Sequence, residues 1–361
     1  MEDLTNFSAE TIPLDLSHPG VHRFAIVVDK PSPPVSAGDG PTNRQPSVSS
    51  LEDLRGKVFS ESMDPCGCQF LHQKLQGSKS EDIQMIFSEV KDRICDLMIH
   101  RWGSYAIQKL FHVCDEEQMN QLVSLITANV SLLMSVCLHP QGSESMKKFI
   151  ECLMTPKQIS YMVAVFSYFT VPLVKNQFGS LVVGHFFRIF PAEDTKPILK
   201  VIADDCSEII VDDSGSRLLQ DIMTKDYSPR GSVKRIITVM FLNIFGLSLK
   251  QFGNRLVQHV IGFERPHLTE HIVSELTGTF DILSRDLYGS EVVKKLMEAS
   301  DKKYAPQIID ELLSSDELPG LVVDPCGNSV LQNAKKYSTG TVHKTLNDLI
   351  GRYSQLITPP N

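Results

Sequence analysis

Cys66, Cys68 and His72 are the residues of this 361-residue chain whose types and spacing most resemble a reactive site. They form a C-x-C followed four residues later by a histidine, and thiolate and imidazole groups at short spacing bind zinc or take part in redox chemistry. A second pattern is His-Leu-Thr-Glu-His, from His267 to His271, which formally matches the H-x-x-E-H of one class of metalloproteases. Whether either pattern carries chemistry depends on the elements that position its residues.

Cys66 lies in the tetrapeptide Asp-Pro-Cys-Gly, which the chain writes again at residues 324–327. Both copies belong to a series of eight segments that begin with glycine, and successive glycines are 36 to 39 residues apart. The segments are GCQFLHQKL from Gly67, GSYAIQKLF from Gly103, GSESMKKFI from Gly142, GSLVVGHFF from Gly179, GSRLLQDIM from Gly215, GNRLVQHVI from Gly253, GSEVVKKLM from Gly289 and GNSVLQNAK from Gly327. A fixed period of this length predicts an array of structural repeats.

The residues after each glycine follow the geometry of a helix. The third and fourth places share one face, and the fourth place is apolar in all eight segments, whereas the third is apolar in seven, with Ser145 the exception. The first, second and fifth places lie on the opposite face, which we expect to be polar and exposed. Amphipathic stretches such as 80–94 and 116–134 fill the space between segments, and 342–357 reads as a final helix. The sequence therefore predicts an all-α solenoid.

This organisation argues against a reactive site. Cys66 and Cys326 fall in the turn that leads into a repeat helix, so we predict no metal site and no bound cofactor there. The His267 pattern falls on a helix between two glycines, where a polar solvated face is ordinary. Ser145 and Lys148 fit S-x-x-K, but the partner motifs of that enzyme class are missing. The chain is not expected to be an enzyme.

The overall composition is that of a globular protein, with 42% hydrophobic and 22% charged residues. The net charge of -8 argues against binding of nucleic acid by bulk electrostatics, so a polyanion would need a local patch. No apolar run reaches 18 residues and the first ten residues are acidic, so we expect no membrane segment and a cytoplasmic location. Because 30–50 is rich in Pro, Ser and Gly, we expect a largely disordered tail at 1–48 and a repeat domain at 49–357.

Eight segments in which Gly is often followed by Asn or Ser, then an aromatic residue or Arg, two apolar residues and Gln, resemble the Pumilio/FBF (PUF) family of RNA-binding proteins. The resemblance implies a right-handed, armadillo-like crescent of eight three-helix repeats plus a capping helix. It also implies a monomer that binds single-stranded RNA on its concave face, one base per repeat, with chain and RNA antiparallel. The implied target is a UGUA-like core in mRNA 3′ untranslated regions, and the implied partners are deadenylation or translation-repression proteins that lower message translation or lifetime.

The resemblance also assigns roles to residues. In the family, the first and fifth residues after the glycine bond the Watson–Crick edge of a base, and the second stacks between bases. Carried over, the edge-reading pairs are Asn254 with Gln258 and Asn328 with Gln332 for uracil, and Ser104 with Gln108 and Ser216 with Gln220 for adenine. The stacking residues are Tyr105, Arg217 and Arg255. The implied site is 5′-U-n-U-A-n-n-A-n.

Four repeats depart from the family pattern. The first has Cys68 with His72, the third has Ser143 with Lys147, the fourth has Ser180 with Gly184, and the seventh has Ser290 with Lys294. The third and seventh repeats also carry glutamate, Glu144 and Glu291, in the stacking place. We therefore expect weaker or relaxed selection of the bases that face these four repeats.

Other interpretations fit parts of the pattern. Short polar residues near a helix start act as caps, and an exposed Gln is a good helix former. A protein-binding solenoid of the armadillo or HEAT type would suit the acidic net charge, but it gives no reason for the Gln that recurs at the fifth place of four repeats. A relative that acts in ribosome assembly would usually have more repeats and longer basic tracts, neither of which the sequence shows.

Overall fold

The computed structural model describes residues 52–77, 79–224, 230–299 and 302–357, which belong to one compact unit, Pro46–Asn361. This part of the chain contains helices and no strand, so the all-α prediction is confirmed. The tail predicted at 1–48 lies outside the described residues, and the division of the chain at residue 49 stays a prediction.

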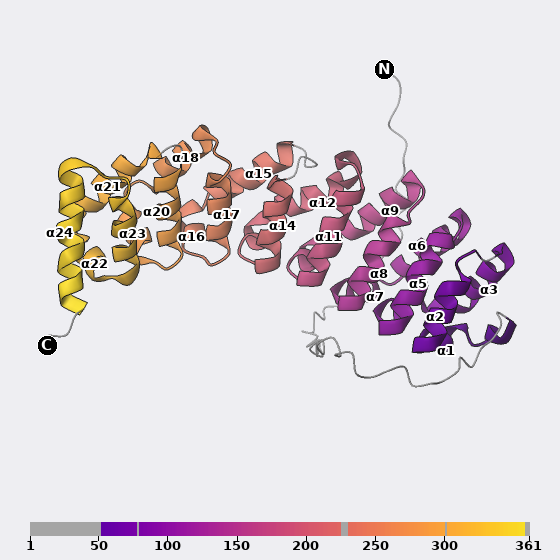
Figure 1. Ribbon diagram of the computed structural model, residues 1–361. Helices are drawn as coiled ribbons and strands as arrows, with labels where there is room; N and C mark the ends of the chain where they lie inside the picture. Colours follow the sequence, from indigo (N-terminus) through magenta and orange to yellow (C-terminus); the bar gives the residue numbers. More distant parts are fainter. Residues whose placement is uncertain (1–51, 78, 225–229, 300–301, 358–361) are drawn as a thin grey trace, which may run out of the picture. The chain divides into compact units, whose positions relative to one another are not determined.

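From α3 to α23 the helices repeat in groups of three, each with a leading helix, a short connecting helix and a helix that carries one glycine of the series, whereas the first group has only the last two of these among the described residues (Figure 1). The glycine helices are α2 (Pro65–Lys74), α5 (Arg101–Val113), α8 (Pro140–Glu151), α11 (Gln177–Ile189), α14 (Asp213–Thr224), α17 (Gly253–Ile261), α20 (Gly289–Glu298) and α23 (Pro325–Lys335). The connecting helices are α1 (Val58–Ser62), α4 (Ile94–Ile99), α7 (Val130–Leu138), α10 (Thr170–Val174), α13 (Cys206–Ile209), α16 (Ile244–Ser248), α19 (Phe280–Arg285) and α22 (Leu318–Val323). The leading helices are α3 (Ser80–Val90), α6 (Glu116–Thr127), α9 (Pro156–Ser167), α12 (Ala192–Asp204), α15 (Arg230–Phe241), α18 (Pro266–Leu276) and α21 (Ala305–Ser314).

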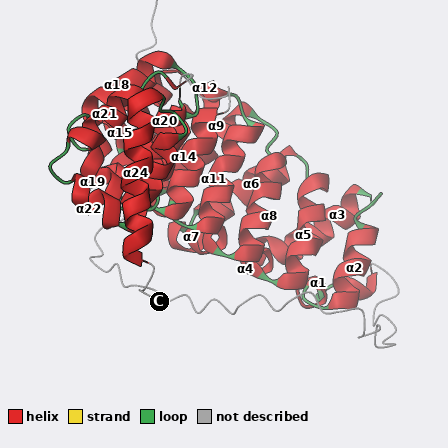
Figure 2. Ribbon diagram, turned by 60° about the vertical axis from the view of Figure 1, so that its left-hand side comes forward, coloured by secondary structure: helices red, strands yellow, loops and turns green. Residues whose placement is uncertain are grey.

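Consecutive glycine helices pack against one another from α2 to α23, so residues at the same place in neighbouring repeats lie in a row. Two 3₁₀ turns, η1 (Glu52–Leu54) and η2 (Lys91–Arg93), precede α1 and α4. The last helix, α24 (Gly340–Ile357), packs on α22 and α23 and buries Leu346, as expected for a capping helix (Figure 2). Such stacking of like helices makes the described unit an α-solenoid.

The core is built from the places predicted to face inward. The fourth-place side chains are at most 2% exposed: Leu71, Ile107, Met146, Val183, Leu219, Val257, Val293 and Leu331. Ser145, the polar exception at the third place, is fully buried, and its hydroxyl donates a hydrogen bond to the carbonyl of Met98 in α4 (3.0 Å). A buried hydroxyl that has its partner costs little, so the exception does not disturb the core.

The repeated Asp-Pro-Cys-Gly is a helix start. Asp64 and Asp324 are N-caps whose carboxylates accept hydrogen bonds from the backbone N–H of Gly67 (3.0 Å) and Gly327 (2.8 Å), and the following prolines occupy the first helical position. The same cap is supplied elsewhere by His100, His139, Asn176, Asp212 and Asp286. The pattern around Cys66 that resembled a metal site is therefore part of a helix cap.

The eight glycines permit a close approach between helices. Each lies against the carbonyl oxygen of the residue six positions earlier, at the end of the connecting helix; a Cβ on Gly179 would lie 2.5 Å from the oxygen of Leu173. These oxygens belong to Glu61, Leu97, Val136, Leu173, Ile209, Leu247, Leu283 and Leu321. No other residue type fits there without moving backbone, which explains the fixed spacing of the series.

No single helix within the described ranges is long and apolar enough to cross a membrane. Within those ranges only α6 and α7, a pair bent between its two helices, reaches the necessary length and apolar composition when both are counted together.

Substituting Gly142 tests the close approach. A Cβ at Gly142 would overlap the carbonyl of Val136, whereas a Cβ at Gly351 in α24 would meet nothing within 4 Å. We predict that Gly142→Ala lowers the free energy of unfolding by about 1–3 kcal/mol, as overpacking does. Gly351→Ala should leave it unchanged or raise it by up to about 1 kcal/mol through helix propensity. Urea unfolding of both variants makes the comparison, and equal effects would contradict the packing argument.

The cap at His139 predicts a pH dependence. Its Nδ1 accepts hydrogen bonds from the N–H of Gln141 (3.2 Å) and Gly142 (3.3 Å), which requires the neutral ring, and burial lowers the pKa of His139 from its usual 6.5. Because the folded state disfavours protonation of His139, the stability that this cap contributes is complete above the unfolded-state pKa. It is lost as pH falls from there through the lower folded-state pKa. His139→Asn keeps an acceptor that does not titrate, so it should lose less stability on acidification than the parent chain. Denaturation at several pH values measures this, and identical pH profiles would contradict it.

Candidate nucleic-acid interface

The first place after each glycine is less exposed than its helical position suggested. Ser104, Ser143, Ser216 and Ser290 are at most 3% exposed, and each hydroxyl donates to the carbonyl three residues earlier at 2.9–3.1 Å. Ser180 makes the same bond but is only partly buried. The close packing of the glycine against the connecting helix carries the next residue into the interior. These serines therefore bond the backbone as donors to the preceding turn and not as N-caps, whose side chains accept from N–H groups.

Cys68 occupies the same place in the first repeat. It is fully buried, its thiol donates to the carbonyl of Pro65 (3.2 Å), and burial, with a smaller effect of the Asp64 charge, raises the pKa of the Cys68 thiol. A protonated, buried thiol is a poor metal ligand and a poor nucleophile.

The two Asn-containing repeats hold their Gln in a fixed orientation. The amides of Asn254 and Asn328 are buried and donate to backbone carbonyls, and their Oδ1 atoms accept from Gln258 Nε2 (2.8 Å) and Gln332 Nε2 (2.7 Å). Each Gln keeps one N–H and its Oε1 without a partner among the described residues. The pair presents an adjacent donor and acceptor outward.

The side-chain amides of Gln108 and Gln220, in the Ser-containing repeats, have no hydrogen-bond partner among the described residues, and both side chains line open cavities. Gln108 lines one of about 540 Å³ together with Tyr105, Gln69 and Glu144. Gln220 lines one of about 590 Å³ between α11 and α14. Both amides are therefore available to a ligand in the row of glycine helices.

Two of the three predicted stacking residues share one carboxylate that sequence reasoning missed. Asp213 bonds Arg217 within α14 (2.8 Å) and Arg255 across from α17 (3.2 Å). All three side chains are at least 40% exposed, so the pairs orient the guanidinium groups more than they stabilise the fold. The i, i+4 spacing of Asp213 and Arg217 could have shown the first pair; the second depends on the packing of neighbouring repeats.

Tyr105, the third predicted stacking residue, is already stacked. The ring of His72 from α2 lies on it with centroids 4.3 Å apart and planes 12° apart. His72 thus occupies one face of Tyr105. The contact gives His72 a packing role at a place where the family pattern has Gln or Glu.

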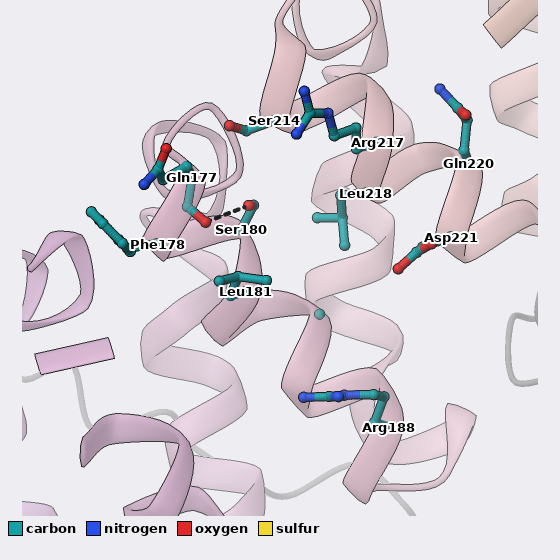
Figure 3. A pocket seen from close by; sticks show the side chains of 11 residues that line it. Gln177, Phe178, Ser180, Leu181, Arg188, Ser214, Arg217, Leu218, Gln220 and Asp221 are labelled. Carbon is teal, nitrogen blue, oxygen red and sulfur yellow. Dashed lines mark hydrogen bonds between the residues drawn. The ribbon is translucent and has the colours of Figure 1, made fainter. Parts of the chain in front are cut away.

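The cavity between α11 and α14 marks the fourth repeat, where an edge-reading side chain is missing (Figure 3). Gly184 stands at the fifth place, and Leu181 and Leu218 form the apolar wall. Arg188 also lines the cavity, and its Nη2 donates to Nδ1 of buried His185 (2.6 Å), whose pKa is lowered by burial and by the Arg188 charge. The cavity thus combines this apolar wall with the polar side chains of Arg188 and Gln220.

The third and seventh repeats contain the same ion pair. Lys147 bonds Glu144 (2.7 Å), and Lys294 bonds Glu291 (2.5 Å), each lysine at the fifth place and each glutamate at the second. Each pair is neutral as a unit, so the glutamates are not isolated negative charges on this face.

The sequence patterns around Cys66, His267 and Ser145 do not form a common site. Within the described ranges, no group of three or more His, Cys, Asp or Glu side chains could hold a metal ion. The ring of His271 packs edge-on against Phe241, and its Nε2 lies 4.0 Å from Oε1 of Glu275. The hydroxyl of Ser145 is buried and bonded to backbone, as described above.

The pattern of the Pumilio-family RNA binding repeat matches residues 62–91, 93–127, 170–203, 243–277 and 282–313. Pumilio homolog 12 of Arabidopsis thaliana is 32% identical over 301 residues, which are 83% of this chain and 50% of the relative. Putative pumilio homolog 7, chloroplastic, from the same organism is 30% identical over 87% of this chain and 48% of its own length. The chain belongs to the Pumilio family.

Solved structures agree with this assignment. The Puf4 RNA binding domain bound to an HO endonuclease RNA 3′ UTR recognition sequence is 27% identical, with a TM-score of 0.72 over 84% of this chain and 94% of that domain. The predicted Pumilio solenoid is thereby confirmed. The chain spans about half the length of the first curated relatives. Five repeats match the family pattern, so the count of eight stays a prediction, as do the roles of individual residues.

The burial difference between first and fifth places predicts different mutational costs. Asn254 is buried and bonded to two carbonyls, so Asn254→Ala should lower the free energy of unfolding by about 1–2 kcal/mol through unmet acceptors. Gln258→Ala removes one half-buried amide and its single hydrogen bond to Asn254 Oδ1, so it should cost less, about 0.5–1 kcal/mol. Chemical denaturation measures both, and equal losses would show that the Gln is part of the fold rather than available for a ligand.

Proposed function

We propose that the chain binds single-stranded RNA sequence-specifically along the row of glycine helices, one base per repeat. The observation that carries the proposal is the Gln at the fifth place of four glycine helices, accessible in each and oriented by Asn in two. Its family membership, and the solved Puf4 domain with its 3′ UTR recognition sequence, support the same ligand class. The second-place residues Tyr105, Arg217 and Arg255 supply flat groups on which bases stack.

The chemistry of each repeat suggests its base. In the sixth and eighth repeats, the outward donor and acceptor of Gln258 and Gln332 match the N3–H and a carbonyl of uracil. In the second and fifth repeats, Gln108 and Gln220 are free to turn, and beside a small serine they suit the N1 and N6 positions of adenine. With chain and RNA antiparallel, the proposed site is 5′-U-n-U-A-n-n-A-n.

The number of intact contacts sets the expected strength. At about 1–3 kcal/mol per base, four repeats supply a gross total of about 4–12 kcal/mol before the cost of ordering the RNA. The net charge of -8 adds no general attraction, and the Glu–Lys pairs on this face are neutral. Binding should therefore depend on base contacts more than on phosphate contacts, with a shallow dependence on salt.

The proposed biological role follows the family. The chain would bind sites in mRNA 3′ untranslated regions in the cytoplasm, as a monomer, with a UGUA-like core. It would lower translation or message stability by recruiting deadenylation or translation-repression proteins. No cofactor or catalytic step is needed for this role.

A protein-binding scaffold is the second candidate. Two observations favour it: Leu181, at a stacking place, is 52% exposed, and one face of Tyr105 is covered by His72. An apolar side chain on this face suits a peptide better than a phosphate backbone.

Selection from a randomised single-stranded RNA pool tests the proposal. The full chain is compared with the double variant Gln258→Ala, Gln332→Ala at fixed salt near physiological strength. We expect enrichment of a U-n-U-A core by the parent chain and loss of both uracils by the variant. The matched control is Gln121→Ala, Gln307→Ala, which removes two amides from the leading helices α6 and α21 and should leave the enriched core unchanged.

Two results would contradict the proposal. Enrichment of no core would show that this face does not read RNA and would favour the scaffold. A core that survives in the variant would show that these Gln side chains do not read it.

A further inference from the structure

Arg217 and Arg255 are the only basic residues at the second place after the eight glycines, and they come from neighbouring repeats. The other second places hold Gln69, Tyr105, Glu144, Leu181, Glu291 and Ser329. Asp213 lies two residues before Gly215 and is the only acidic residue at that place in the series. The other seven glycines are preceded at the same distance by Pro65, Arg101, Pro140, Gln177, Gln251, Leu287 and Pro325. The chain thus has one carboxylate at the point where its two arginines can share it.

These three side chains form a bridge between α14 and α17. Oδ2 of Asp213 accepts a hydrogen bond from Nη2 of Arg217 (2.8 Å), and Oδ1 accepts one from Nη1 of Arg255 (3.2 Å). Within the described ranges, Asp213 is the only hydrogen-bond acceptor of either guanidinium group. The guanidinium carbon of Arg255 also lies 5.5 Å from the centre of the Phe252 ring. One carboxylate therefore sets the distance between two groups that project from adjacent repeats.

The bridge limits what the two arginines can do. A guanidinium group can stack flat on a base, or it can donate to a phosphate, which binds RNA whatever its sequence. The side chains of Arg217 and Arg255 are 68% and 46% exposed, so a phosphate could reach either one if it were free. Bonds to Asp213 occupy donors on both groups and cancel one of the two positive charges. Because these bonds lie in the guanidinium plane, they leave a face of each group for stacking.

We propose that Asp213 is a positioning residue that makes RNA recognition by the fifth and sixth repeats sequence-specific. It holds Arg217 and Arg255 as stacking groups and keeps them from phosphates. In the antiparallel register these repeats face bases four and three, and one of the two bases lies between the arginines. The edge of that base then meets Gln220 or Gln258 in a fixed plane. The inference rests on the proposed RNA binding and its register.

The test is binding of the full chain and of Asp213→Asn to RNAs that differ from the proposed site at single positions. The parent chain should prefer its base by about tenfold at positions one, three, four and seven. Asp213→Asn should lower the preference to about threefold or less at positions three and four, and leave it unchanged at positions one and seven.

The released arginines should also change binding that does not depend on sequence. RNAs of unrelated sequence should bind Asp213→Asn more tightly than the parent chain. The slope of log affinity against log salt should steepen by about 0.7 for each phosphate that a released arginine contacts. A residue that only supports the fold would not lower selectivity and raise unselective binding together.

Asp194→Asn is the matched control. Asp194 is an exposed carboxylate in the first turn of the leading helix α12, as Asp213 is in the first turn of α14, so both variants change the charge at the same point of a helix. Asp194→Asn should leave every base preference unchanged. The double variant Arg217→Gln, Arg255→Gln removes the groups through which Asp213 acts. Adding Asp213→Asn to it should change neither the remaining preferences nor the salt slope.

The outcomes separate this inference from the proposed function. If the parent chain selects no base at positions one, three, four and seven, RNA reading fails and the inference fails with it. If the parent chain selects these bases but Asp213→Asn weakens all four preferences equally, or none of them, the role of Asp213 is overturned while RNA reading stands. An effect of Asp213→Asn that persists without the two arginines would overturn it as well.

Discussion

The approach of each glycine to a backbone carbonyl six residues earlier is the contact on which the other features depend. In seven of the eight repeats the same carbonyl also accepts the N–H of the residue three positions before the glycine, at 3.0–3.2 Å, and in six of them that residue is the N-cap. Cap, carbonyl and glycine together fix the angle between the connecting helix and the glycine helix. That angle buries the first place, keeps the fifth place accessible and sets equivalent residues of neighbouring repeats in a row.

Much of this could be predicted from the sequence, because the close approach excludes every side chain at the glycine and so leaves a visible period. The apolar fourth place, the helix starts at Asp64 and Asp324, and the capping role of α24 all follow from local rules. The exposure of the first place was not predictable from helical periodicity. It depends on how closely the preceding helix packs, which a helical projection does not contain.

Contacts between repeats could not be predicted from the sequence either. Asp213 reaches Arg255 across 42 residues, and His72 covers Tyr105 across 33, because neighbouring glycine helices lie side by side. The Glu–Lys pairs looked like departures from the family pattern when residues were compared place by place. The unequal exposure of the two ends of each pair is visible only in three dimensions.

The central claim is that neighbouring glycine helices each face one successive base. Photocrosslinking with 4-thiouridine tests it most directly, with the modified base placed at position one or at position three of the RNA and the crosslinked peptides identified by mass spectrometry. The account predicts crosslinks from position one to peptides of α23 or its neighbour α20, and from position three to α17 or its neighbours, so that the crosslink moves by about two repeats. Crosslinks to the leading helices, or the same peptide from both positions, would contradict it.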